Sequence, residues 1–433
     1  MMMLRSLFCL CLCGVALTAQ PMDVGGHCDL ALLDQMDSGF SQPSPHVHLE
    51  QEHLSQNCLR LLNRKLAQVP APIALDLSGN HLGDKGIAEW VSAVPANSLA
   101  TLSLAGNQLT SQSAKALSQL LQHQQSLRVL DLSHNRIGQA GIAAVMQAAK
   151  RHSTLHQLGL TNNHLRGNDV LPLAADLQET QINSLYLTGN ALTGRAFGRL
   201  MEAASKHAPL RKLVLNGNPL TDVDFQSLGG MLSQQSYLEE LQLGDVRPSL
   251  RGMEALAGGL EANKGLKSLA LFSNRLNDQD LAILLRGLDE HPRLHWLDLA
   301  NNRLTHVGAE VLARWLDKQS HLTTLYLSQN RLKDKGVHAL SKALKYHRHL
   351  KVLGLGHNAI GDHGAELLAN LLHGHGSITH LEFNDNDFGH AGAKHLGRAL
   401  AHNNTLIAID ISSNDLGDMG VAHLSDGLLA NRS

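Results

Sequence analysis

One phrase recurs thirteen times along this chain. It has the form LxxLxLxxNxL, as in LHWLDLANNRL (294–304) and LKVLGLGHNAI (350–360), and successive copies start 28 residues apart, with two steps of 27. A repeat of fixed period constrains the fold strongly, because every copy must build the same small unit. The Asn slot is occupied by Asn80, Asn107, Asn135, Asn163, Asn190, Asn218, Val246, Asn274, Asn302, Asn330, Asn358, Asn386 and Asn414.

Each unit predicts a short strand followed by a helix. The LxL alternation places the leucines on one face of a strand and the intervening residues on the other. Segments such as GDKGIAEWVSAV (83–94) then carry apolar residues at helical spacing. At four helix starts we expect an aspartate to cap the helix and a glycine two residues later to allow close approach to a neighbour. These pairs are Asp84 and Gly86, Asp334 and Gly336, Asp362 and Gly364, and Asp418 and Gly420.

A strand–turn–helix unit cannot bury its own apolar face, so the units must stack. Neighbouring strands lie about 4.8 Å apart, whereas packed helices need about 8–10 Å. The stack must therefore curve into an α/β solenoid, a horseshoe with parallel strands on the concave face and helices on the convex face.

The 28-residue unit resembles the ribonuclease-inhibitor-like class of leucine-rich repeat proteins over residues 72–433. Within that class, the chain looks most similar to bacterial exported and effector leucine-rich repeat proteins. The resemblance implies recognition of a protein partner through the concave face. An alternative that it leaves open is an effector that acts in a host cell as a GTPase regulator or a ubiquitin-ligase adaptor.

The first 71 residues precede the repeats and divide into two parts. Residues 1–19 have the short positive start, the apolar run and the Leu17-Thr18-Ala19 site of a cleavable signal peptide, although cleavage after Ala16 also fits. Residues 20–71 predict a flexible link at 37–47 and a helical cap at 48–69 that covers the first repeat. We therefore expect a secreted or periplasmic protein, or one in a host cytosol if it is an effector.

Two cysteines, Cys28 and Cys58, remain after removal of the leader. In an oxidising compartment they can form one disulfide that ties the cap to the preceding segment. Two unrelated buried thiols are the alternative.

Composition excludes several classes of function. A net charge of −2 and 17% charged residues give no electrostatic basis for binding nucleic acid, and no later segment is apolar enough to span a membrane. No nucleophile motif or zinc spacing occurs, so we expect neither an enzyme nor a cofactor or metal. We expect His347, His349, His373 and His375 in solvent-facing connections. The best metal constellation, if one exists, is His357, His380, Glu382 and Asp385.

Binding residues are expected at the outward strand positions, which differ from repeat to repeat. Large side chains gather there in the later units, and Trp and Tyr are typical interface anchors. The predicted protein-binding residues are Tyr186, Lys212, Glu240, Gln242, Phe272, Trp296, Tyr326, His380 and Glu382. Phe272, Trp296 and Tyr326 are the expected anchors of a monomeric protein, and the alternative is that they only cover neighbouring strands. The recurring Asp at the middle outward position is expected to be structural.

The seventh unit departs from the pattern, with Val246 in the Asn slot and Pro248 two residues later. Because the spacing stays at 28 residues, we expect the stack to continue through this point with a reshaped loop.

Overall fold

The computed structural model describes residues 46–432 except 71, 290 and 375, and it places all the described strands in one parallel sheet. The strands follow one another in chain order, so each repeat pairs only with its two neighbours. They are β1 (His46–His48), β2 (Ile73–Asp76), β3 (Leu99–Ser103), β4 (Val129–Asp131), β5 (Gln157–Gly159), β6 (Ser184–Tyr186), β7 (Lys212–Val214), β8 (Glu240–Gln242), β9 (Ser268–Ala270), β10 (Trp296–Asp298), β11 (Thr324–Tyr326), β12 (Val352–Gly354), β13 (His380–Glu382) and β14 (Ala408–Asp410).

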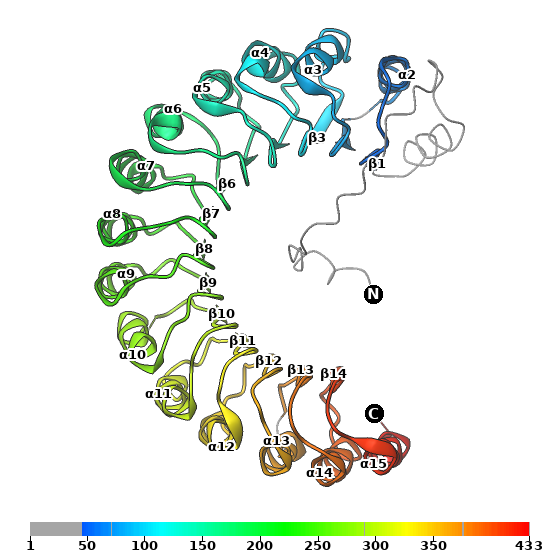
Figure 1. Ribbon diagram of the computed structural model, residues 1–433, viewed down its shortest axis with the longest axis vertical. Coiled ribbons are helices and arrows are strands. Elements are labelled where there is room, and N and C mark those ends of the chain that lie inside the picture. The colour runs from blue at the N-terminus through cyan, green and yellow to red at the C-terminus, as the bar shows by residue number, and fades with distance from the viewer. Residues whose placement is uncertain (1–45, 71, 290, 375, 433) are drawn as a thin grey trace.

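A helix follows each strand and lies on the outside of the arc (Figure 1). The helices are α2 (Gln56–Leu66), α3 (Gly83–Val91), α4 (Ala114–His123), α5 (Gly138–Ala149), α6 (Leu171–Asp176), α7 (Gly194–Lys206), α8 (Asp222–Gln234), α9 (Leu250–Ala262), α10 (Asp278–Gly287), α11 (His306–Leu316), α12 (Lys333–Leu344), α13 (Asp362–Gly374), α14 (His390–Leu400) and α15 (Gly417–Ala430). Short 3-10 turns occupy Ser111–Ser113, Gly167–Val170 and Leu177–Glu179. The horseshoe with strands inside and helices outside is confirmed.

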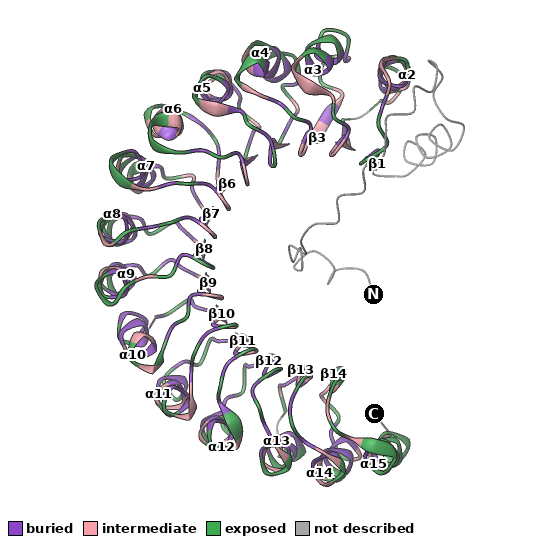
Figure 2. Ribbon diagram, in the orientation of Figure 1, coloured by how far each residue is buried: buried purple, intermediate pink, exposed green. Residues whose placement is uncertain are grey.

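The core is a continuous layer between the sheet and the helices. In a typical unit, Leu297 of β10, Leu299 just after it and Leu312 of α11 are almost completely buried. Trp90 and Trp315 are buried on their helices as expected. Figure 2 shows the exposed residues on the outer sides of the helices and over much of α15. Apolar burial between stacked units is the main source of stability in such a fold.

The segment before the repeats contributes a strand of its own. Residues 46–48 pair in register with β2, so His46 and Val47 belong to the sheet and not to the predicted flexible link. The Leu54 N–H donates to the Asn80 side chain at 3.1 Å, as a repeat leucine does, although Glu52 stands in the Asn slot. Residues 46–66 therefore form a fourteenth, degenerate unit. Its helix begins only at Gln56.

Cys58 lies on the buried side of α2 and is disulfide-bonded. Its predicted partner, Cys28, lies outside the described residues, as does the predicted leader at 1–19. The Cys28–Cys58 pairing therefore stays a prediction.

The Asn column joins neighbouring repeats by hydrogen bonds in both directions. The Asn302 side-chain amide donates to the carbonyls of Leu271 and Leu299 at 3.0 and 2.9 Å. Its oxygen accepts the N–H groups of Asn274 and Leu276 at 3.1 and 2.9 Å. One buried side chain thus satisfies backbone groups of two repeats, which is the role that an amide, both donor and acceptor, can fill.

In a regular repeat, two column Asn side chains donate to the same leucine carbonyl. At Val246, the two carbonyls that a column Asn would contact each lose one of these two donors. Val246 is buried and has no amide to donate. The carbonyl of Leu215 keeps the Asn218 amide at 2.8 Å, and the carbonyl of Leu243 keeps the Asn274 amide at 2.7 Å. This redundancy explains why one unit can lose its Asn.

Val246 also lacks the side-chain oxygen that would accept N–H groups of the preceding repeat, and rearranged hydrogen bonds compensate for this loss. The Leu220 N–H, which in a regular repeat would donate to the next Asn, donates instead to the Asn218 carbonyl at 2.9 Å. Pro248 has no N–H, so the Asn274 side chain accepts the Arg247 N–H at 2.7 Å in its place. β8 and β9 keep the regular register, which confirms a continuous stack with a reshaped loop.

The four aspartates predicted as caps, Asp84, Asp334, Asp362 and Asp418, do not cap their own helices, so that prediction is wrong. Asp84 accepts the N–H of Thr110 at 2.8 Å and the hydroxyls of Thr110 and Ser113, all in the next repeat. Asp334 likewise accepts the Gly361 N–H at 2.7 Å. Burial raises the pKa of Asp84, but the bonds from Ser113 and Thr110 outweigh it and lower that pKa below its usual range. These carboxylates therefore bind one repeat to the next.

A second polar column runs where each helix ends, and it contains several histidines. His347 Nε2 lies 2.6 Å from the Gln319 carbonyl, and Nδ1 accepts the Leu350 N–H at 3.2 Å. His347 is buried, which corrects its expected solvent exposure; His349 and His373 are exposed, and His375 is outside the described residues. The column comprises Gln124, His152, Thr180, His207, Gln235, Asn263, His291, Gln319, His347, Asn403 and Asn431.

Burial lowers the pKa of the histidines in this column. It acts on His152, His207 and His347, and it lowers the pKa of His291 to about 4, with the positive charge of Lys264 adding to the effect. Neutral imidazole suits His152 and His347 because Nε2 donates to a carbonyl while Nδ1 accepts an N–H. The histidines here are structural.

Candidate binding surface on the inner face of the sheet

The nine predicted binding residues all lie on the inner face, on or next to a strand, and all are half-buried. Strand geometry places them there, because the flanking leucines point into the core and the residues between them point away from it. The structure gathers them into two groups, one polar on β6–β8 and one aromatic and acidic on β9–β13.

The polar group is a chain of contacts across three strands. Lys212 Nζ lies 5.1 Å from the centre of the Tyr186 ring and 2.9 Å from Glu240 Oε1. Gln242 donates to the same Glu240 oxygen at 2.6 Å, and Asn216 donates to Gln242 at 3.1 Å. Burial lowers the pKa of Lys212, but the Glu240 carboxylate and the Tyr186 hydroxyl outweigh it, so the net shift is upward. The lysine therefore stays charged and is held in position.

The aromatic residues use the spaces left by small neighbours. The Phe272 ring covers Gly244, where an added Cβ would lie 2.3 Å from the ring. Trp296 and Tyr326 meet edge to face, with ring centres 5.9 Å apart and planes at 65°. Tyr326 in turn lies against Gly354 of β12. The rings cover neighbouring strands and still expose part of their surface, so their role as anchors stays a prediction.

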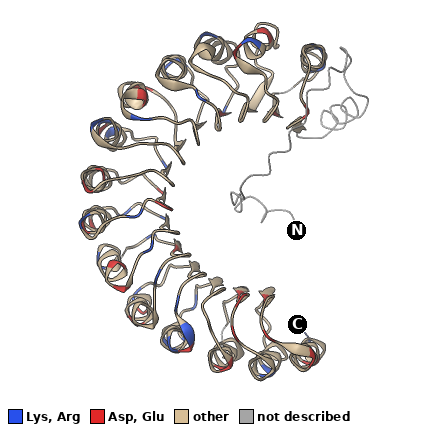
Figure 3. Ribbon diagram, in the orientation of Figure 1, with Lys and Arg blue, Asp and Glu red and all other residues tan. Residues whose placement is uncertain are grey.

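Carboxyl groups surround the aromatic pair. Burial raises the pKa of Asp298 to about 6 against the lowering effect of the Ala300 N–H, and the charge of Glu382 adds to the rise. Burial raises the pKa of Glu382, and the negative charge of Asp410 adds to the rise. Burial also raises the pKa of Tyr326 to about 12, with smaller contributions from the charges of Glu382 and Asp298. Figure 3 shows the acidic residues on β13 and β14 at this end of the inner face. The region favours a positively charged group on its ligand.

The middle-position aspartates have the structural role expected of them. Asp76, Asp131 and Asp410 each accept the N–H and the hydroxyl of the serine two residues later, at 2.5 to 3.0 Å. Asp298 has Ala300 at that position and accepts only its N–H, at 2.8 Å. Asp298 therefore differs from the others, and the serine-to-alanine change two residues later is the signal that could have found it.

His380 lies on β13, and its Nδ1 lies 2.9 Å from the hydroxyl oxygen of the neighbouring Thr379. The possible metal constellation of His357, His380, Glu382 and Asp385 is not assembled, since residues 46–432, apart from the three undescribed positions, contain no group of three or more suitable ligands.

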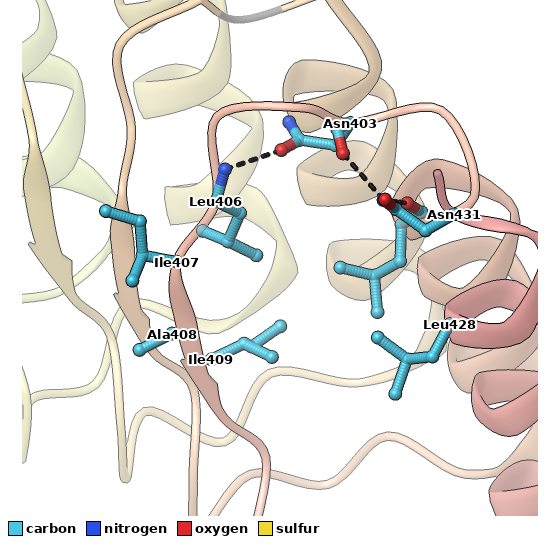
Figure 4. A pocket seen from close by; sticks show the side chains of 8 residues that line it. Asn403, Leu406, Ile407, Ala408, Ile409, Leu428 and Asn431 are labelled. Atoms are coloured by element: carbon cyan, nitrogen blue, oxygen red, sulfur yellow. Dashed lines mark hydrogen bonds between the residues drawn. The ribbon is translucent and has the colours of Figure 1, made fainter. Parts of the chain in front are cut away.

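The C-terminal edge exposes the cross-section of the core. Leu406, Ile407, Ile409 and Leu428 line a hollow beside β14, where an interior repeat would place its next strand (Figure 4). Asn403 accepts the Leu406 N–H at 2.7 Å, and Asn431 donates to the Asn403 carbonyl at 2.7 Å. The hollow follows from the position of β14 as the last strand.

Comparison with known protein families supports the repeat assignment. A model of the family described as Leucine Rich repeat matches residues 74–89, 123–146, 318–341, 346–369 and 402–425. An internalin from Listeria monocytogenes is 22% identical with a TM-score of 0.49, over 92% of this chain and 93% of that one. The actin-binding site 2 of leiomodin-1 is 20% identical with a TM-score of 0.27, over 28% of this chain and 71% of that one. No curated protein matches. Among the residues that the structure describes, no helix is long and apolar enough to cross a membrane.

Proposed function

Because the chain is a leucine-rich repeat protein, we propose that it binds another protein through the concave face of β6–β13. Phe272, Trp296 and Tyr326 are the proposed anchors, and the chain of contacts from Tyr186 to Gln242 orients the partner. The observation that carries the proposal is the Trp296–Tyr326 pair, whose rings are fixed edge to face and partly exposed.

Fixed aromatic rings favour binding because they offer contact area without a large loss of side-chain freedom. Trp296 is held by Tyr326, and Tyr326 is held against Gly354. The carboxyls of Asp298 and Glu382 beside them are partly desolvated, as their raised pKa values indicate. A lysine or arginine of the partner placed there would relieve both carboxyls, so the proposed partner presents a basic residue next to an apolar one.

Binding suits this surface better than catalysis does. Catalytic sites are concave pockets that exclude water, and the described strands form an open curved sheet. We further propose that the protein acts as an exported, non-enzymatic monomer without a cofactor. Export is supported by the leader-like residues 1–19, and an uncleaved protein in a cytosol would instead favour the host-cell effector alternative.

The proposal is tested by comparing proteins captured by the wild type and by the double variant Trp296→Ala/Tyr326→Ala. A matched control is Tyr237→Ala/Tyr346→Ala, because these two tyrosines are 53% and 73% exposed and lie in helix-to-strand connections away from the inner face. We expect the inner-face variant to lose specific partners that the control variant keeps. If it keeps all of them, the concave face is not the binding surface.

A further inference from the structure

Three arginines occupy the same position in three consecutive repeats. Arg275, Arg303 and Arg331 each follow the column Asn directly, on the loop that leads from strand to helix. The residue at this position is Arg247 one repeat earlier, and Ala359, Asp387 and Asp415 in later repeats. Arg247 pairs with Asp245, so the three arginines that follow it form a row of their own, which we call the arginine row.

Backbone hydrogen bonds hold the loops of the arginine row in register. The Arg303 N–H donates to the Leu276 carbonyl and the Arg331 N–H to the Leu304 carbonyl, both at 2.8 Å. The Asn301 amide also donates to the Ser273 hydroxyl at 2.9 Å across two of these loops. Since each loop extends its strand, the arginines emerge at about the strand spacing of 4.8 Å.

The guanidinium groups of the row are available for a ligand. All three side chains are exposed, and none forms an ion pair or a side-chain hydrogen bond with the part of the chain that the structure describes. Arg247 differs, because it pairs with Asp245 at 2.9 Å. Three unpaired positive charges in a row are unusual on a chain of net charge −2.

The arginine row belongs to the repeats that carry the aromatic anchors. Phe272 precedes Arg275 by three residues, Trp296 precedes Arg303 by seven, and Tyr326 precedes Arg331 by five. A partner seated on the aromatic residues would therefore reach the row at the adjoining edge of the sheet. No other three consecutive repeats combine large inner-face aromatics with this series of arginines.

We propose that the arginine row binds an acidic segment of a protein partner, with about three carboxylates within a few residues. This inference rests on the proposed concave-face binding and specifies the chemistry of the partner at its edge. Guanidinium groups bind carboxylates with two parallel hydrogen bonds, and acidic residues three or four apart on a helix have a spacing of about 5–6 Å, close to that of the row.

A protein segment fits the surface better than a nucleic acid does. The inner face beside the row carries Asp298, Glu382 and Asp410, which would repel a phosphate backbone that continued across the sheet. An acidic peptide confined to the edge avoids those carboxylates and can place apolar side chains on the aromatic residues.

The test measures binding of fluorescein-labelled octaglutamate to the full chain at low salt by anisotropy, with octauridylate as the competing class. The variant R275Q/R303Q/R331Q removes the row. Glutamine is tolerated at Arg275, whose φ is 59°, because Gln108 has a φ of 60° at the same position of its repeat. The matched control R251Q/R286Q/R314Q removes three exposed arginines of α9, α10 and α11.

We expect R275Q/R303Q/R331Q to weaken octaglutamate binding about tenfold or more, because three exposed ion pairs together contribute about that much. The control R251Q/R286Q/R314Q should weaken it less than about twofold. Equal losses in the two variants, no binding by the wild type, or tighter binding of octauridylate would overturn the proposal. Such a failure leaves the dependence of captured partners on Trp296 and Tyr326 intact, so it is distinguishable from failure of the proposed function.

Discussion

Asn302→Ala should destabilise the solenoid more than any exposed substitution in the same loop. The wild-type side chain is buried, donates to three carbonyls and accepts two N–H groups. Alanine makes none of these bonds, and the site lies between the repeats of β9 and β10, where solvent cannot replace all of them.

The size of the effect follows from the two N–H groups. Asn274 and Leu276 lose the oxygen to which their N–H groups donate, and a buried unsatisfied donor costs about 1–3 kcal/mol. The carbonyls are less critical because oxygen tolerates partial satisfaction better. We therefore expect a loss of about 3–5 kcal/mol in the free energy of unfolding, at the upper end of single-residue effects.

Urea denaturation followed by circular dichroism measures this loss, with transitions by a second probe to check that the array unfolds as one unit. Asn301→Gly is the matched control, because Asn301 is exposed and its φ of 53° suits glycine. If Asn302→Ala lies within about 1 kcal/mol of the control, the Asn column does not contribute to stability as argued.

Two further predictions concern pH. The pKa of His291 is lowered to about 4, so its contribution to stability is complete above about pH 6.5 and is lost as pH falls toward 4. His291→Gln, with a residue that the column already has at Gln235 and Gln319, should flatten the melting temperature between pH 7.5 and 4.5, and an unchanged slope would contradict this. Asp298, with its pKa raised to about 6, costs stability above pH 6, so Asp298→Asn should raise the melting temperature at pH 7.5. That gain should shrink from pH 6 to 4, and a gain independent of pH would point to packing instead of charge.

The repeat period alone determined the architecture. A 28-residue unit with a leucine strand and a helix has few ways to bury its apolar face, so the horseshoe, the core leucines and the inner-face residues followed directly from the sequence. The same logic missed the β1 unit, because Glu52 replaces the column Asn.

Contacts between repeats were harder to predict than contacts within one. Asp84 stands at a helix start, and only the curvature of the stack brings Thr110 and Ser113 to it. His347 sits in a polar segment, and its burial depends on the Gln319 carbonyl one repeat earlier. The division of the binding residues into two groups also depends on small residues such as Gly244 and Gly354, whose missing side chains leave room for a neighbour's ring.

Partner capture with the inner-face and connector variants tests the central claim most directly. We predict that Trp296→Ala/Tyr326→Ala loses specific partners while its circular dichroism spectrum stays that of the wild type, and that Tyr237→Ala/Tyr346→Ala keeps them. Retention of every partner by the inner-face variant, or equal losses from both variants, would contradict recognition through the concave face.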